Sequence, residues 1–286
     1  GSSSEVKVGM LTNTGEIKAK RLSGKVTDLI NCQGSRFSVV GEALLEAQSF
    51  INDGQFFVGA YADINTAEFG NTGDITIGTK LDLAAEYLKH LSGSICVGDD
   101  VRLIGLKEWI NQGDFSAEGG LSLEESSEGS INNAGTIEVA RLSGQVAGIE
   151  NQREAVLQVV EEAFLSAQSF VNDGHFNVGA YANLETAALT NTGDIAVGAQ
   201  LDLTVAYLKH LAGSIRAGGD VHLVSFKEWV NQGDFTAEGA LLLEDAQKAL
   251  VNNLGSIEAD SLKGCITAIR NQKNAVLEMK QYALLR

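Results

Sequence analysis

The chain has no proline, three cysteines, and only 21 lysine and arginine residues against 37 aspartate and glutamate residues, which gives a formal net charge of −16. Phosphate binding needs clustered basic side chains, so this balance argues against a nucleic-acid-binding protein. It also leaves no basic face for an anionic membrane surface. No run approaches the roughly 18 apolar residues that would cross a bilayer. We therefore expect neither nucleic-acid binding nor membrane insertion.

The three cysteines, Cys32, Cys96 and Cys265, are an odd number without metal-ligand spacing, and we expect small buried apolar side chains rather than a disulfide framework. The absence of proline beside 32 glycines indicates a backbone that reverses often and keeps its N–H donors in ladders. A hydrophobic fraction of 44% is that of a folded chain.

A long repeat covers the sequence. The segment Ser49–Gly54 returns 120 residues later as Ser169–Gly174, and Tyr87–Leu91 returns at the same offset as Tyr207–Leu211, with no insertion or deletion between copies. We interpret residues 8–286 as one continuous array of tandem repeats, at approximately 13–132, 133–252 and a partial copy at 253–286. Residues 1–7, which begin Gly-Ser-Ser-Ser, are interpreted as a leader or cloning scar outside the fold.

A shorter period of about 20 residues lies inside each copy, marked by an apolar residue, a spacer, an asparagine and often a glycine, so that each long repeat holds six short units. After Asn71, apolar residues alternate at Ile75, Ile77, Leu81 and Leu83, which is the period of short strands with one buried face. Solenoids of paired helices have units longer than about 30 residues. The pattern therefore predicts an all-β parallel solenoid of about fourteen coils, with strand even over the helix-compatible stretch 43–49.

Coils stacked at the strand spacing bring equivalent side chains together. One predicted internal stack contains Phe37, Phe56, Ile75, Ile95, Phe115 and Ile137, and a second contains Leu11, Leu29, Phe50, Phe69, Trp109 and Ile131. The asparagines are predicted to hydrogen-bond up and down a column as a structural ladder. We expect Leu91 and Leu211 to interrupt it at a differently shaped turn. Its members are Asn13, Asn31, Asn52, Asn71, Asn111, Asn133, Asn151, Asn172, Asn191, Asn231, Asn253 and Asn271.

The segments Asn71–Leu83 and Asn191–Leu203 resemble the filamentous-haemagglutinin repeat of two-partner secretion exoproteins, and they are similar to the stalks of contact-dependent growth inhibition proteins. The resemblance implies a right-handed parallel β-helix, a hand that the crossover rule also favours. It further implies a secreted or bacterial cell-surface protein, an outer-membrane partner transporter, and a receptor on a host or neighbouring cell. The chain would then be a non-catalytic stalk segment carrying an adhesive or toxin domain.

We expect no catalytic, cofactor-binding or metal-binding residue. His90 and His210 are one duplicated position, and the adjacent Asp99 and Asp100 point to opposite faces of a strand. Asp74 and Asp114 lie two coils apart, separated by Ser94, too far to share a calcium ion unless Ser94 helps.

Two alternatives stay open. A polysaccharide-binding or polysaccharide-cleaving β-helix would show a carboxylate cluster in one copy alone, or a row of exposed aromatic side chains. The candidates for that row are Tyr61, Tyr87, Tyr181 and Tyr207. A host-protein-binding effector would expose an apolar patch in one copy. Because a solenoid has open ends, we also expect end-to-end association of copies.

Overall fold

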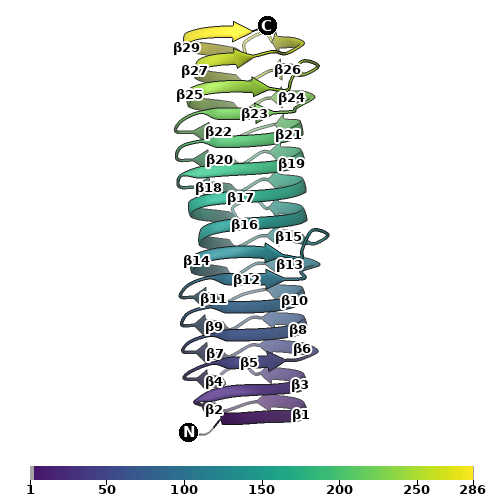
Figure 1. Ribbon diagram of the computed structural model, residues 1–286, viewed down its shortest axis with the longest axis vertical. Coiled ribbons are helices and arrows are strands. Elements are labelled where there is room, and N and C mark those ends of the chain that lie inside the picture. The colour runs from purple at the N-terminus through teal and green to yellow at the C-terminus, as the bar shows by residue number, and fades with distance from the viewer. Residues whose placement is uncertain (1–2, 286) are drawn as a thin grey trace. The chain divides into compact units, whose positions relative to one another are not determined.

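Every regular element of the chain that the structure describes is a β-strand (Figure 1). The structure is a computed structural model that describes the backbone of residues 3–285 and the side chains from residue 9 to residue 285. No helix capable of crossing a membrane occurs in this range. Gly1 and Ser2 of the expected leader lie outside the described residues, whereas Ser3–Lys7 belong to strand β1 (Ser3–Asn13) and pair with Arg21–Lys25. A cloning origin of this segment stays a prediction.

The strands form a parallel β-solenoid of about fourteen turns with about 20 residues a turn. A typical coil begins with β6 (Ser49–Asn52), turns into β7 (Gln55–Val58) and continues into the first half of β8 (Ala62–Asn71). We call these three sides faces A, B and C. Each strand pairs in parallel with its counterpart about 20 residues away, as β7 does with β9 (Asp74–Ile77). The coil is therefore the repeating unit that the short sequence period predicts.

Contacts divide the chain into two units, residues 1–146 and 147–286. The division falls inside β16 (Thr136–Asn151), 14 residues after the predicted repeat border at 132. The remaining strands of the first unit are β2 (Glu16–Ala19), β3 (Arg21–Asn31), β4 (Arg36–Val39), β5 (Ala43–Glu46), β10 (Leu81–His90), β11 (Ser94–Val97), β12 (Val101–Ile104), β13 (Glu108–Asn111), β14 (Asp114–Glu124) and β15 (Ser130–Asn133).

The second unit repeats the same order of faces. Its strands are β17 (Val156–Asn172), β18 (His175–Val178), β19 (Tyr181–Asn191), β20 (Asp194–Val197), β21 (Leu201–His210), β22 (Ser214–Ala217), β23 (Val221–Val224), β24 (Glu228–Asn231), β25 (Asp234–Glu244), β26 (Leu250–Asn253), β27 (Ser256–Gly264), β28 (Ala268–Asn271) and β29 (Val276–Leu285). Within each unit, the strands nearest the viewer in Figure 1 run from left to right as the chain rises, which is the sense of a right-handed coil.

The core of each unit consists of side-chain stacks that follow the strand register. On face B of the first unit, Phe37 is in register with Phe56, and the column continues through Ile75, Ile95 and Phe115 to Ile137, as predicted. On face A, Phe50 and Phe69 stack with ring centroids 4.8 Å apart and planes 3° from parallel. Burial of one such ring contributes about 1.5–3 kcal/mol, so each coil is stabilised mainly by covering its neighbour.

The face A column contains one member that the sequence pattern missed. Leu88 is in register with both Phe69 and Trp109, and it is fully buried. The strand expected at residues 43–49 is present in part, because Ala43–Glu46 form β5 and Ser49 begins β6, whereas residues 47 and 48 lie between the two strands.

The prediction of buried cysteines was wrong. Cys96 and Cys265 are exposed, and Cys32 is half-buried. Cys96 occupies an outward position of β11, between the buried Ile95 and Val97, so the alternation of the strand points its thiol away from the core.

Candidate functional site

The asparagine column joins successive coils by side-chain hydrogen bonds at the end of face A. In the first unit, Asn13 Nδ2 donates to Asn31 Oδ1 at 2.8 Å, Asn31 Nδ2 to Asn52 Oδ1 at 2.7 Å and Asn52 Nδ2 to Asn71 Oδ1 at 2.8 Å. The second proton of each amide goes to the backbone, as from Asn31 Nδ2 to the carbonyl of Gln55 at 3.0 Å. A buried amide is thereby satisfied at a bend where the backbone leaves the ladder.

The second unit has the same column. Asn151 donates to Asn172 at 2.8 Å, Asn172 to Asn191 at 2.7 Å, and Asn253 to Asn271 at 2.7 Å. The equivalent bonds from Asn111 to Asn133 and from Asn231 to Asn253 are both 2.8 Å. All these asparagines except Asn271 are buried.

The interruption of the column was assigned to the wrong residue. The structure places His90, not Leu91, in register with Asn71 and Asn111, and it places His210, not Leu211, in register with Asn191 and Asn231. The following turn, which reaches Ser94 through Gly93 at φ 73°, is one residue longer than the turn after Asn71. The prediction placed the rung two residues before Gly93, at Leu91, whereas the longer turn places it three residues before, at His90. The differently shaped turn itself is present.

Each histidine replaces one asparagine rung with a neutral imidazole. Asn71 Nδ2 lies 3.1 Å from His90 Nδ1, and His90 Nε2 lies 3.2 Å from the carbonyl oxygen of Asp114. An amide nitrogen can only donate, so Nδ1 accepts and the proton resides on Nε2. Burial lowers the pKa of His90, because the imidazolium would lose its hydration, and the hydrogen bond to Asp114 opposes this only in part. Burial likewise lowers the pKa of His210.

Two buried polar atoms on the strand next to the His90 rung have no hydrogen-bond partner among the described residues. They are Asn111 Oδ1, which receives no donor because His90 donates to the backbone instead, and the indole nitrogen of Trp109. The same pair, Asn231 Oδ1 and Trp229 Nε1, recurs in the second unit. Both copies therefore carry the same weak rung.

The carboxylates considered as catalytic candidates cap the backbone or lie singly. Asp100 Oδ1 accepts the backbone N–H of Gly120 at 2.7 Å, at the register shift in β14. Asp220 Oδ1 makes the same bond to Ala240 at 2.7 Å. Asp74 and Asp114 pair with Ser94 on either side, and Ser94 donates to Asp74 Oδ1 at 2.9 Å. The described residues contain no group of three or more potential metal ligands.

The tyrosines that were candidates for a row of exposed aromatic side chains lie in different surroundings. Tyr61 donates to Asp82 at 2.8 Å, and Tyr181 donates to Asp202 at 2.5 Å. The bond to Asp202, together with burial, raises the pKa of Tyr181 to about 12. Tyr87 is half-buried, whereas Tyr207 is exposed with the ammonium of Lys227 5.8 Å from its ring centroid. The hydroxyls of Tyr61 and Tyr181 therefore support coil-to-coil contacts.

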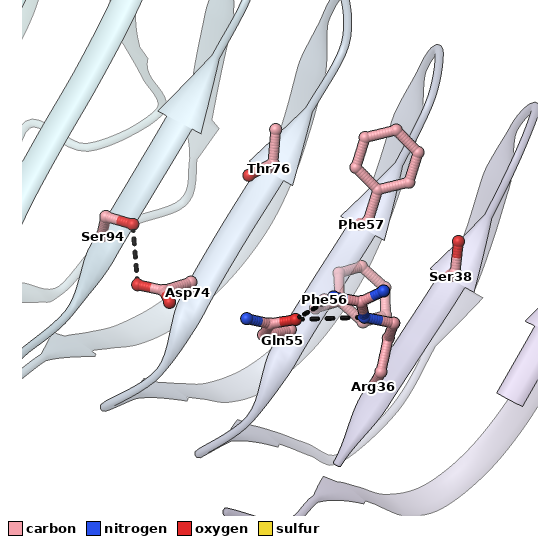
Figure 2. Close-up of a pocket in the computed structure, with 8 residues that line it drawn as sticks. All are labelled: Arg36, Ser38, Gln55, Phe56, Phe57, Asp74, Thr76 and Ser94. Atoms are coloured by element: carbon pink, nitrogen blue, oxygen red, sulfur yellow. Dashed lines mark hydrogen bonds between the residues drawn. The ribbon is translucent and has the colours of Figure 1, made fainter. Parts of the chain in front are cut away.

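A hollow of about 560 Å³ lies on face B of the first unit, across the outward side of β4, β7, β9 and β11. We call it the Phe57 groove. Phe56, whose side chain is buried in the core, and Phe57 both line it, and the Phe57 ring projects outward from β7 and is 41% exposed (Figure 2). The residues used below are Arg36, Gln55, Phe57, Asp74, Thr76 and Ser94.

Polar groups form a row beside the Phe57 ring. Gln55 Oε1 accepts from Arg36 Nε at 3.1 Å and from Arg36 Nη2 at 2.9 Å, which fixes the two planar groups against each other (Figure 2). Asp74 follows on the next strand, held by the hydroxyl of Ser94. A second hollow of about 370 Å³ continues past this row toward the turn and shares Arg36, Gln55 and Asp74 with the first.

The second unit lacks most of this arrangement. The positions 120 residues later hold Val156 for Arg36, His175 for Gln55 and Asn177 for Phe57. Asp194 and Ser214 are retained, with a 2.7 Å hydrogen bond between them, and His175 Nδ1 lies 3.4 Å from Asp194 Oδ2. Outward residues carry no periodic signal, so the groove escaped the sequence analysis. The two copies differ in sequence at these three positions, and that difference is the signal from which the groove could have been predicted.

Exposed apolar side chains near the turn between faces B and C occur in both copies. Val40 and Leu44 of the first unit correspond to Val160 and Phe164 of the second, and each is exposed by 44% or more. The patch in one copy alone, which the alternative of a host-protein-binding effector would require, is therefore not found at this turn. Comparison of the chain with protein-family models, with curated proteins and with solved structures finds no match.

Proposed function

We propose that the chain is a structural segment of the stalk of a large secreted bacterial surface protein, of the filamentous-haemagglutinin repeat type. The observation that carries the proposal is the internal ladder. Both units devote nearly every inward position to coil-on-coil stacking, and the same hydrogen-bonded asparagine rungs recur in both copies. Adding coils to such an array extends it without new chemistry.

The outward positions agree with a scaffold role. The carboxylates cap turns and bulges, and the four histidines either form rungs or lie beside single aspartates, as His222 does at 3.3 Å from Asp202. The parent protein would then use an outer-membrane transporter for export and place an adhesive or toxin domain before a receptor on another cell. These partners follow from the resemblance at Asn71–Leu83 and Asn191–Leu203.

Surface labelling tests the proposal. Antibodies raised against the purified chain are applied to intact cells of the source bacterium, with and without protease treatment of the cell surface. We expect labelling of intact cells that protease removes, and loss of labelling when the neighbouring transporter gene is deleted. A signal that appears only after the cells are permeabilised would contradict the proposal.

A further inference from the structure

We propose that the Phe57 groove binds a neutral oligosaccharide. The inference goes beyond the stalk role, because Phe57, Gln55 and Asp74 are exposed on the outward side of their strands and are not part of the buried core. Phe57 is in register with Ser38 and Thr76, on the side of β7 opposite the core. The ring is 41% exposed, and the second unit has Asn177 at this position.

The shape of the groove suits an extended ligand. It crosses four adjacent parallel strands, from Arg36 on β4 to Ser94 on β11. Three strand spacings correspond to roughly 14 Å. The ligand would therefore be longer than one sugar ring and would run across the strands, lying flat on the sheet beside Phe57 (Figure 2).

The groove offers a ligand one apolar ring face and, beside it, polar atoms that are available for hydrogen bonds. The Phe57 ring offers its face to the C–H groups of a pyranose. Beside it, Gln55 Nε2, Asp74 Oδ2 and the Thr76 hydroxyl make no hydrogen bond within the described part of the chain, and all three residues are exposed. An amide donor next to a carboxylate acceptor matches vicinal hydroxyl groups, each of which donates and accepts.

Other ligand classes fit this surface less well. An anionic ligand would meet the Asp74 carboxylate beside Gln55, and the Arg36 guanidinium directs two of its N–H groups to Gln55 Oε1. An apolar peptide or helix would find only one large exposed apolar side chain in the groove, and a peptide strand would find no free edge, because β7 is paired on both sides. A metal ion would find one carboxylate. A polyhydroxyl ligand without charge remains the best match to a single ring flanked by an amide, a carboxylate and hydroxyls.

Rigid positioning strengthens the case for binding. The Arg36–Gln55 and Asp74–Ser94 hydrogen bonds hold the polar row in place before a ligand arrives, and β4, β7, β9 and β11 are internal strands of the solenoid. A pre-organised site loses little conformational entropy on binding.

Calorimetric titration of the full chain tests the proposal. The probes are linear hexasaccharides of β-1,4-glucose, α-1,4-glucose and β-1,4-mannose, with hexagalacturonate as the charged comparator. We expect at least one neutral probe to bind at concentrations up to about 5 mM. Phe57→Ala should weaken that binding tenfold or more, whereas Asn177→Ala, the matched position of the second unit, should leave it unchanged.

Both substituted side chains point away from the core, so we expect each variant to unfold at the same denaturant concentration as the parent chain. A change in binding can then be assigned to the lost side chain. Binding of a neutral probe that depends on Phe57 but not on Asn177 supports the proposal. No binding of any neutral probe, binding that survives Phe57→Ala, or tighter binding of hexagalacturonate would overturn it. None of these results bears on surface display, so the stalk role stands or falls separately.

Discussion

At the scale of single residues, the asparagine column explains how a polar side chain recurs in a core without penalty. Away from the histidine rungs, a buried amide inside the column donates to the next coil and accepts from the previous one, as Asn172 does between Asn151 and Asn191. An unpaired buried amide costs roughly 1–3 kcal/mol, so the rungs depend on one another. The ladder is a specificity device as much as a source of stability, because a coil shifted by one residue would turn its amides outward.

Removal of one internal rung should be costly. Asn172→Ala deprives Asn191 Oδ1 of its donor and Asn151 Nδ2 of its acceptor, and we expect the free energy of unfolding to fall by about 2–4 kcal/mol. Asn271→Ala is the matched control, since Asn271 is exposed and receives a donor only from Asn253. Denaturant unfolding measures both variants, and equal losses would contradict the account.

The histidine rungs should make stability depend on pH. The folded-state pKa values of His90 and His210 lie below the ordinary value of 6.5, so the unfolded chain takes up protons first as the pH falls. Their contribution is fully present above about pH 6.5 and is lost as the pH falls below it. Protonation of Nδ1 would also set two donors, His90 and Asn71, against each other.

Replacement of both rungs isolates this effect. We expect the double variant His90→Asn, His210→Asn to lose stability less steeply than the parent chain between about pH 6.5 and pH 5, a window above the ordinary range of carboxylates. Thermal unfolding at several pH values in this window gives the slope of the unfolding midpoint against pH for the parent chain and for the double variant. A double variant as steep as the parent would show that other groups cause the loss.

At the scale of strands and turns, close stacking of successive bends explains where glycine is needed. A Cβ atom on Gly73 would lie 2.1 Å from the carbonyl oxygen of Gly54 in the coil beneath. Gly15 occupies the same position of its own turn, but a Cβ atom there would meet nothing within 4 Å. The requirement comes from the neighbouring coil, because neither glycine has a positive φ.

This difference gives a matched pair of substitutions. Gly73→Ala should lower the midpoint of thermal unfolding clearly, by an amount that corresponds to about 2 kcal/mol or more, because the backbone of two coils must move apart. Gly15→Ala should change stability by less than about 0.5 kcal/mol or raise it slightly. Calorimetry measures both, and a Gly15 variant as unstable as the Gly73 variant would refute the stacking argument.

Inward residues were the predictable part of each coil. Phe56, Ile75 and Asn52 recur because the coil above and the coil below both constrain them, so their periodicity survives in the sequence. His90 escaped because its turn holds one more residue than its neighbours. Side chains of a strand alternate between inward and outward, so the inward Leu88, which is in register with Phe69, makes His90 the next inward residue and therefore the rung. Distance along the chain is thus a weaker guide to register than strand periodicity.

At the scale of the whole molecule, the two copies share their cores and differ on their outward faces. The rung residues, the two tryptophans and their unpaired indole nitrogens are common to both. Arg36, Gln55 and Phe57 are outward-facing, and the positions 120 residues later hold Val156, His175 and Asn177. Periodicity could therefore predict the scaffold but not the Phe57 groove or the exposure of Cys96, which depend on the direction of single side chains.

Scalar couplings across hydrogen bonds test the central claim most directly. In the labelled protein, we expect nuclear magnetic resonance to connect Asn31 Nδ2 to the side-chain carbonyl of Asn52, and Asn151 Nδ2 to that of Asn172. At the histidine rung, the coupling should instead join Asn71 Nδ2 to His90 Nδ1. Side-chain amides that lack these couplings and exchange with water at the rate of exposed asparagine would contradict the stacked-coil account.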